Sequence, residues 1–299
     1  MKKQTHKNNG MGLKEYAKLL IQTAFTEDAS DRDVTTQALV HPQDTCEAHL
    51  LAKEPLTLAG LFVAEAAFKR LDKRISFKAY FKDGESVKKG AIIARIRGRC
   101  SPILTAERVA LNFLQRLSGV ATATRRLAAE LKGTGARLLD TRKTTPCMRL
   151  LERYAVRSGG GFNHRFGLSD EMLIKDNHIM AAGGVAQALA RVKGHYREGT
   201  LVEVEVTNLK EVREALAGSA DIILLDNMTL AQMRKAVKII NNAALVEASG
   251  GVTVKNAATI AATGVNFISS GAITHSARAV DISLEVVSIC RRRTRPKLR

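Results

Sequence analysis

The sequence predicts an α/β fold in which an N-terminal α/β sandwich domain is followed by an incomplete β/α barrel. In the second half of the chain, apolar runs end at Glu205, Asp226, Ser249 and Ser270, which are 21, 23 and 21 residues apart. That spacing fits one strand, one helix and two short loops per repeat, and nearly continuous apolar strands indicate a parallel sheet buried on both faces. A doubly wound sheet has similar repeats, but polar groups at almost every strand end favour the barrel. We count six or seven strands, fewer than the eight of a complete barrel.

The composition is that of a globular protein with one large domain or two ordinary ones. The 299 residues are 45% hydrophobic and 25% charged, with few aromatic residues and no Trp, which argues against base-stacking proteins that bind single strands. Neither a secretory signal nor an apolar run of membrane-spanning length is present. Cys46, Cys100, Cys147 and Cys290 form no CxxC pair, which argues against a zinc site or a disulfide framework. We therefore expect a cytoplasmic protein that binds no membrane.

The net charge of +18 comes largely from the two ends of the chain. Residues 1–11 and 291–299 together supply nine of the excess positive charges, and we expect both segments to be disordered basic tails. Such tails can give weak, salt-sensitive affinity for nucleic acid without being the function.

The first part of the chain predicts helices and short strands in alternation. An amphipathic helix begins after Gly12, and Asp33 lies in a turn-forming segment where capping is its expected role before an apparent strand. Residues 56–71 contain a strand, a glycine turn and a helix. Residues 77–99 indicate two strands around an Asp-Gly turn, and Pro102 opens a long helical region.

Basic side chains follow short apolar runs in the stretch 140–179. Arg142 and Lys143 come after one such run, His164 and Arg165 after three glycines, and Lys175 after another run. A guanidinium is a planar fork that fits a carboxylate or phosphate, whereas an ammonium acts as a point charge. Several such cations at neighbouring strand ends predict a site for a small polyanionic ligand.

Later strand ends carry carboxylates and then glycine-rich loops. Glu205 and Asp226 could bind ribose hydroxyls directly or through Mg²⁺, or pair with the cations. Ser249-Gly250-Gly251 and Ser269-Ser270-Gly271 are typical of a barrel phosphate site. The residues thus indicate a phosphorylated sugar bound beside a small dicarboxylate or diphosphate. No nucleophile with an adjacent base stands out, so we expect no covalent catalysis.

Several long motifs occur in order and together resemble the quinolinate phosphoribosyltransferase family, also called nicotinate-nucleotide diphosphorylase (carboxylating). They are AERVALNFLQRLSG at 106–119, RKTTP at 142–146, GGGFNHRFGLSD at 159–170, LIKDNHI at 173–179, LLDN at 224–227, EASGG at 247–251 and ISSGAITHS at 268–276. The resemblance implies a sandwich domain at 12–117 with 278–290, and a seven-stranded incomplete barrel at 118–277.

The resemblance also implies a reaction. Quinolinate attacks C1 of phosphoribosyl pyrophosphate through its ring nitrogen, and pyrophosphate and CO2 leave. Nicotinate mononucleotide, a precursor of NAD, is formed. The pyridinium stabilises the carbanion left by decarboxylation, so Mg²⁺ is the only cofactor expected, beside the departing pyrophosphate.

Site residues follow by similarity. The carboxylates of quinolinate would be bound by Arg142, His164, Arg165 and Lys175, with Thr141 also contacting substrate and with Lys143 and Lys175 near phosphates. Glu205 and Asp226 would face the ribose and the metal. The 5′-phosphate site would be Ser249, Gly250, Gly251, Ser270 and Gly271, with His275 nearby. Arg108 matches an arginine that a neighbouring subunit contributes in this family, so a homodimer or a higher oligomer is expected.

Two departures and two alternatives accompany this interpretation. Cys147 stands where the family commonly has Gly, and segment 27–35 lacks the family's usual glycine. A related type II phosphoribosyltransferase acting on nicotinate or another small acid without decarboxylation is one alternative. A basic nucleic-acid-binding protein is the other, although no recognisable binding motif is present.

Overall fold

The computed structural model describes residues 12–193, 195 and 200–291, which form two compact units. The sandwich unit consists of residues up to Ala123, residues 147–159 and residues from Ala277 onward, and the barrel unit consists of 124–146 and 160–276. The units divide a few residues beyond the predicted boundary at 117/118, and segment 147–159 groups with the sandwich. Except for Arg291, the tails expected to be disordered lie outside the described residues.

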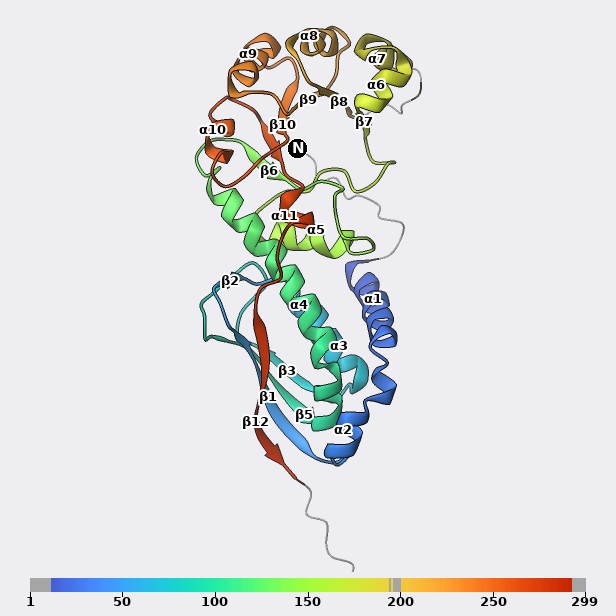
Figure 1. Ribbon diagram of the computed structural model, residues 1–299, viewed down its shortest axis with the longest axis vertical. Helices are drawn as coiled ribbons and strands as arrows, with labels where there is room; N and C mark the ends of the chain where they lie inside the picture. The colour runs from blue at the N-terminus through green and yellow to red at the C-terminus, as the bar shows by residue number, and fades with distance from the viewer. Residues whose placement is uncertain (1–11, 194, 196–199, 292–299) are drawn as a thin grey trace, which may run out of the picture. The chain divides into compact units, whose positions relative to one another are not determined.

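The sandwich unit is built on an antiparallel sheet in the order β12-β1-β5-β3. Alternate residues of β1 are buried, from Cys46 to Ala52, as a half-buried strand requires. β12 returns from the far end of the sequence to pair with β1. The elements of this unit (Figure 1) are α1 Leu13–Glu27, the 3-10 helix Ser30–Arg32, α2 Val34–Leu39, β1 Thr45–Ala52, β2 Leu56–Thr57, α3 Leu61–Leu71, β3 Ser76–Ala79, β4 Ser86–Val87, β5 Ile92–Arg99, most of α4 Cys100–Ala129, α5 Arg149–Ser158 and β12 Ile282–Cys290.

One local prediction for this unit is wrong, and another holds with a different strand pairing. The apparent strand after Asp33 is helix α2, because the Asp33 carboxylate accepts a hydrogen bond from the Thr36 N–H at 2.9 Å and caps it. Hydrogen bonds from Thr36 lower the pKa of Asp33. The two strands expected around the Asp-Gly turn are present as β3 and β4, and they pair with other strands, β3 with β5 and β4 with β2.

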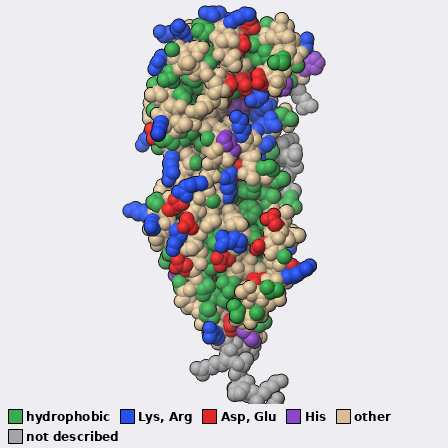
Figure 2. Space-filling model, in the orientation of Figure 1, with side chains coloured by type: hydrophobic (Ala, Val, Ile, Leu, Met, Phe, Trp, Pro, Cys, Tyr) green, Lys and Arg blue, Asp and Glu red, His purple; other side chains and the backbone are tan. Residues whose placement is uncertain are grey.

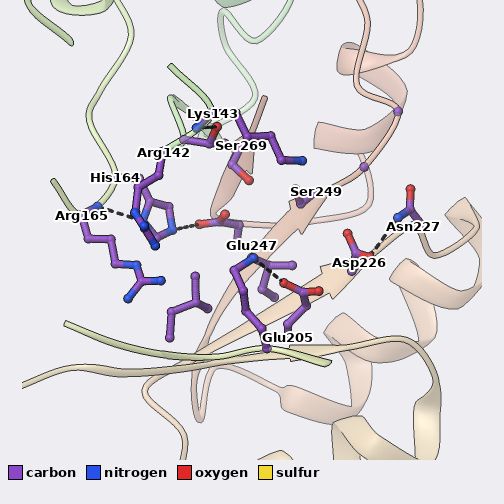
Figure 3. A pocket seen from close by; sticks show the side chains of 16 residues that line it. Arg142, Lys143, His164, Arg165, Glu205, Asp226, Asn227, Glu247, Ser249 and Ser269 are labelled. Atoms are coloured by element: carbon purple, nitrogen blue, oxygen red, sulfur yellow. Dashed lines mark hydrogen bonds and ion pairs between the residues drawn. The ribbon is translucent and has the colours of Figure 1, made fainter. Parts of the chain in front are cut away.

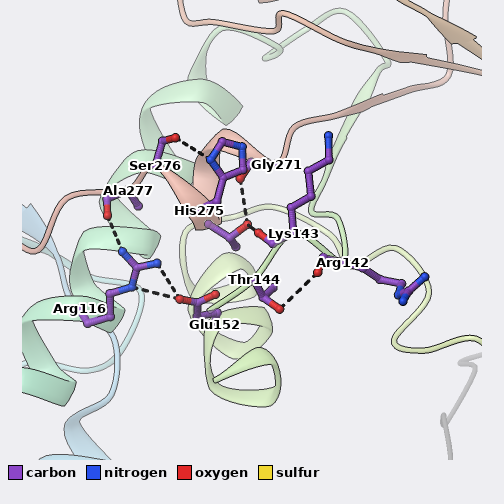
Figure 4. A network of polar contacts seen from close by, with 10 residues as sticks. Arg116, Arg142, Lys143, Thr144, Glu152, Gly271, His275, Ser276 and Ala277 are labelled. Carbon is purple, nitrogen blue, oxygen red and sulfur yellow. Dashed lines mark hydrogen bonds and ion pairs between the residues drawn. The ribbon is translucent and has the colours of Figure 1, made fainter. Parts of the chain in front are cut away.

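A partly buried ion pair joins α4 to α5 in the sandwich unit. The Arg116 guanidinium donates to Glu152 at 2.7 and 3.0 Å and to the Ala277 carbonyl at 2.5 Å (Figure 4). Glu152 is fully buried, so its charge requires such a partner. The contact fixes α5 and the start of the C-terminal segment against α4.

The barrel unit contains a parallel sheet of six strands in the order β6-β11-β10-β9-β8-β7. A single parallel bridge from Leu139 to Phe162 lies beside β6, so the sheet has six strands and one bridge where the family resemblance implied seven strands. The open order is that of an incomplete barrel. Its elements are β6 Arg137–Leu139, β7 Met172–Ile174, α6 Asp176–Ala182, α7 Val185–Lys193, β8 Val202–Val206, α8 Leu209–Ala217, β9 Ile222–Asp226, α9 Leu230–Ile240, β10 Leu245–Ser249, α10 Ala257–Ala261, β11 Phe267–Ser269 and α11 Ala272–His275.

The strands and helices of the barrel unit form where the repeats predicted them. Residues 222–225 of β9 are all buried, because α8 and α9 lie along the outside of the sheet (Figure 1). Asn208 and Thr229 cap the N-termini of these two helices through their side chains. All six strands are parallel, so their carboxyl ends meet along one edge. Among the described residues, no helix has the length and apolar character needed to span a membrane.

Candidate active site

A cavity of about 550 Å³ opens at the carboxyl ends of the barrel strands. We call it the mouth pocket. The residues that line it are Thr141, Arg142, Lys143, His164, Arg165, Leu173, Lys175, Glu205, Leu224, Asp226, Asn227, Glu247, Ser249, Gly250, Gly251 and Ser269. The predicted cations, carboxylates and first glycine loop are therefore brought together from segments far apart in the sequence. In the upper part of Figure 2, which is the barrel unit, acidic side chains lie beside Lys, Arg and His side chains.

The mouth pocket has a cationic side and a side formed by a carboxylate and a glycine loop. In Figure 3, Arg142, His164 and Arg165 lie on one side, Asp226, Asn227 and Ser249 on the other, and Glu247 between them. This separation suits a ligand pair with different chemistry at its two ends.

Asp140, at the end of β6, holds the loop that carries the cations. It is fully buried and accepts hydrogen bonds from the His164 N–H at 2.7 Å and the Asn163 side chain at 2.6 Å. These two hydrogen bonds fix the Asn163 side chain and the His164 backbone, directly before Arg165. In the loop that follows β6, the Lys143 carbonyl accepts a hydrogen bond from the Thr274 hydroxyl at 2.9 Å, which joins α11 to that loop.

The ring of His164 lies among carboxylates. Its Nδ1 is 3.1 Å from Glu171, and its Nε2 is 3.1 Å from Glu203 and 3.6 Å from Glu247. Burial alone would lower the pKa of His164, but Glu171, Glu203 and Glu247 raise it to about 11. Burial and then the charge of Glu203 raise the pKa of Glu247 to about 8.

Arg165 is buried against Arg142 and the same acidic group. Burial first, and then the nearby charge of Arg142, lower the pKa of Arg165, whereas Glu171 and Glu203 oppose the shift. One guanidinium nitrogen of Arg165 donates to the Glu171 carbonyl at 3.2 Å. Two guanidinium groups held close together are a strong attraction for a dianion.

Carboxylates mark the ends of the neighbouring strands β8 and β9. Lys175 donates to Glu205 at 2.9 Å, so part of the charge of each is already compensated, as the ion-pair alternative expected. Asn227 donates to Asp226 at 2.9 Å, and its own N–H donates to the Ser249 carbonyl at 3.0 Å. Asp226 is thereby fixed beside the loop that follows β10.

The glycine loops differ in how they face the mouth pocket. Gly250 and Gly251 line it with positive φ values of 95° and 59°, which favour glycine. From the next loop Ser269 lines the pocket, whereas Ser270, Gly271 and His275 do not. A side chain at 271 would lie 2.9 Å from Lys143 and 3.0 Å from His275, so these residues are close neighbours. The phosphate role of this second loop stays a prediction.

One group of side chains among the described residues is close enough to hold a metal ion, and it was not predicted. His164, Glu203 and Glu247 each offer an atom, all within 4.8 Å of one another. The predicted pair Glu205 and Asp226 is not in that group, but it ends adjacent strands at the rim, and Mg²⁺ often takes one or two carboxylates together with substrate phosphates.

Glu203 and Glu247 are also the main residues that the sequence analysis missed. Glu203 is two residues before Glu205 and Glu247 two before Ser249, so each shares a strand face with a predicted residue. That period of two was an available signal. Arg108 is exposed on α4 in the sandwich unit, and its role in a neighbouring subunit stays a prediction.

Family models match both parts of the chain. Residues 33–118 match the quinolinate phosphoribosyl transferase N-terminal domain, and residues 120–285 match the C-terminal domain of the same family. The matches meet close to the predicted boundary at 117/118.

Similar proteins carry related names. A probable nicotinate-nucleotide pyrophosphorylase [carboxylating] of Bacillus subtilis is 41% identical over 269 residues, 90% of this chain and 93% of its own length. Quinolinate phosphoribosyltransferase [decarboxylating] 2, mitochondrial, of Nicotiana glauca is 42% identical over 288 residues, 90% of this chain and 82% of its own.

Solved structures show the same fold. The nicotinate-nucleotide pyrophosphorylase from Francisella tularensis has a TM-score of 0.86 and 41% identity, covering 91% of this chain and 96% of its own. A human nicotinic acid phosphoribosyltransferase, at 14% identity, 88% and 74% coverage and a TM-score of 0.61, shares the fold alone.

Proposed function

The chain belongs to the quinolinate phosphoribosyltransferase family, and on this premise we propose that the mouth pocket transfers phosphoribosyl to quinolinate with loss of CO2. The substrates are quinolinate and phosphoribosyl pyrophosphate. The products are nicotinate mononucleotide, pyrophosphate and CO2, a step of de novo NAD biosynthesis. The observation that carries the proposal is the division of one pocket into a cationic side and a carboxylate and glycine side (Figure 3).

The dicarboxylate binds on the cationic side. Arg142 and Arg165 offer planar forks for its two carboxylates, and Lys175 and Lys143 add positive charge toward the phosphates. The 5′-phosphate of the co-substrate occupies the loop of Gly250 and Gly251, where glycine allows a ligand to approach the backbone closely and where nothing lies within 4 Å of a Cβ built at Gly251. Ser270, Gly271 and His275 complete this end.

The ribose lies between the two ends, beside Glu205 and Asp226. These two carboxylates would hold Mg²⁺ together with substrate oxygens, which is a suitable donor set for that ion. Bound there, Mg²⁺ would neutralise charge on the departing pyrophosphate. Lys175, which contacts Glu205 at 2.9 Å, orients that carboxylate toward the ribose.

Catalysis then rests on orientation and charge. The protein holds the ring nitrogen in line with C1, so that the N–C1 bond forms as the bond to pyrophosphate breaks. The positive charge of the new pyridinium stabilises the electron pair that stays on C2 when the C2–carboxylate bond breaks, and a proton then takes the place of the carboxylate. Arg142 and Arg165 must therefore bind the dianion firmly without stabilising the bound carboxylate so much that CO2 can no longer leave.

Steady-state kinetics of Arg142→Ala test this placement. We expect KM for quinolinate to rise by about tenfold to a hundredfold, because a bidentate charged contact contributes about 1.5–3 kcal/mol, whereas KM for phosphoribosyl pyrophosphate should change little. An equal rise in the two KM values, or no rise in KM for quinolinate, would place the dicarboxylate elsewhere.

We also propose a homodimer with shared active sites, in which the partner's Arg108 completes the mouth pocket. The exposure of Arg108 on α4 supports this proposal. Mixing the inactive variants Arg108→Ala and Lys175→Ala should restore about a quarter of wild-type activity if subunits exchange at random in a twofold dimer. No recovery in verified mixed dimers would assign Arg108 to its own subunit.

A cytoplasmic location, supported by four free cysteines, is proposed as well.

A further inference from the structure

The ring of His164 is enclosed by acidic side chains from three separate elements. Glu171 precedes β7, Glu203 lies within β8 and Glu247 within β10. Both ring nitrogens are in contact with carboxylates, at 3.1 Å to Glu171 and 3.1 Å to Glu203. His164 lines the mouth pocket, but its polar atoms are directed at the protein.

Glu203 has no exposure to solvent, and Glu247 has 1%. An ionised carboxylate in such surroundings is costly unless a cation compensates it. The Arg165 N–H, 2.8 Å from Nδ1, would suit a neutral ring. The two carboxylates in closest contact with the ring, Glu171 and Glu203, outweigh that single contact, so the ring is an imidazolium with a proton on each nitrogen.

Glu171 links this ring to the cationic side of the mouth pocket. Its side chain contacts His164, and its carbonyl accepts a hydrogen bond from the Arg165 guanidinium at 3.2 Å. Because Glu171 contacts both residues, a shift of the His164 ring displaces Glu171 and with it the carbonyl that holds the Arg165 guanidinium. Asp140 holds the backbone at this point, where it accepts a hydrogen bond from the His164 N–H at 2.7 Å.

We propose that Glu203 and Glu171 are positioning residues of the reaction, which hold the His164 ring as a fixed cation and thereby place Arg165 to bind the dicarboxylate. Glu247 supports them from the third side at 3.6 Å. The inference rests on the proposed binding of quinolinate in the mouth pocket. It assigns His164 an indirect role, since a direct grip on substrate would require the ring to leave one of its carboxylates.

The test is steady-state kinetics and thermal unfolding of Glu203→Gln, with Glu203→Asp as the conservative variant. Because loss of a supporting contact commonly costs an order of magnitude in activity, KM for quinolinate should rise about tenfold in Glu203→Gln. KM for phosphoribosyl pyrophosphate should stay within about twofold. Glu203→Asp, which keeps the charge, should recover part of the loss. A purely electrostatic effect has the opposite sign, because removal of a negative charge should tighten binding of a dianion.

Glu171→Gln is the second variant, since Glu171 is 19% exposed and its replacement is easier to accommodate. Glu47→Gln is the matched control, because Glu47 also contacts a histidine at 3.1 Å but lies in the sandwich unit. We expect Glu171→Gln to raise KM for quinolinate and Glu47→Gln to leave it unchanged.

Three results would overturn the inference. One is a lower melting temperature for Glu203→Gln and Glu171→Gln with unchanged KM for quinolinate. Another is tighter quinolinate binding in both. The third is a stoichiometric metal ion in the purified wild type that Glu203→Gln loses, which would make the group a metal site. If Arg142→Ala also leaves KM for quinolinate unchanged, it is the proposed substrate placement that fails instead.

Discussion

Replacement of Gly250 by Ala tests how the glycine loop positions Asp226. Gly250 has a φ of +95°, and a Cβ there would lie 2.1 Å from the Asn227 side-chain oxygen and 3.0 Å from its backbone nitrogen. Asn227 cannot retreat freely, because its N–H bonds the Ser249 carbonyl and its side chain bonds Asp226. The added methyl group must therefore displace Asn227, and Asp226 with it.

The loss of stability has two sources. A left-handed conformation costs a residue with a Cβ about 1–2 kcal/mol. Crowding of a well-packed site adds about 1–3 kcal/mol. Gly90→Ala measures the conformational cost without the crowding, because Gly90 has a φ of +82° and nothing lies within 4 Å of an added Cβ. We thus expect about 2–5 kcal/mol for Gly250→Ala and about 1–2 kcal/mol for Gly90→Ala.

Chemical denaturation of both variants measures these losses, and steady-state kinetics measures the displacement. Gly250→Ala should raise KM for phosphoribosyl pyrophosphate, whereas Gly90→Ala, in a turn of the sandwich unit, should retain wild-type kinetics. Equal losses of stability, with KM for the co-substrate unchanged in both variants, would refute the reasoning.

Four further predictions concern other parts of the chain. Asp140→Asn should cost about 1.5–3 kcal/mol, because an amide cannot accept both hydrogen bonds of the carboxylate, and should raise KM for quinolinate; unchanged unfolding and kinetics would contradict it. Cys147→Gly should stabilise the protein by up to about 1 kcal/mol without altering turnover, since Cys147 has a φ of +60°; a less stable variant would argue against strain. In the folded chain the pKa of Glu247 is raised from 4.5 to about 8, so wild-type stability should fall as the pH rises between these values. The melting temperature of Glu247→Gln should depend less on pH over this range. An identical pH dependence of the melting temperature in the two proteins would count against this. Deletion of residues 291–299, most of which lie outside the described residues, should abolish nucleic-acid retention and leave turnover nearly intact; loss of turnover in a folded dimer would make the tail part of the enzyme.

The site was predictable where chemistry follows strand ends. Glu205, Asp226 and Ser249 are spaced by whole βα units, and the carboxyl ends of parallel strands must meet at one edge. The order of the strands and the pairing of β12 with β1 are long-range facts that no local pattern contains. The seventh strand of the barrel is reduced to the bridge between Leu139 and Phe162, which is too short to give a periodic signal.

Other features escaped because packing overrides local preference. Val34, Thr35 and Thr36 are β-branched and favour a strand, yet the Asp33 cap and burial of Thr36 make this segment helical. The inner carboxylates Glu203 and Glu247 could have been placed from the period of two in their strands. Glu171 could not, because its contact with His164 depends on how an irregular loop closes.

Product analysis tests the central claim most directly. Purified protein is incubated with phosphoribosyl pyrophosphate, Mg²⁺ and either quinolinate or nicotinate, and both nucleotide and CO2 are measured. Nicotinate mononucleotide and CO2 in equal amounts, from quinolinate alone, are the predicted result. Turnover of nicotinate but not quinolinate would contradict the account and point to a relative that does not decarboxylate.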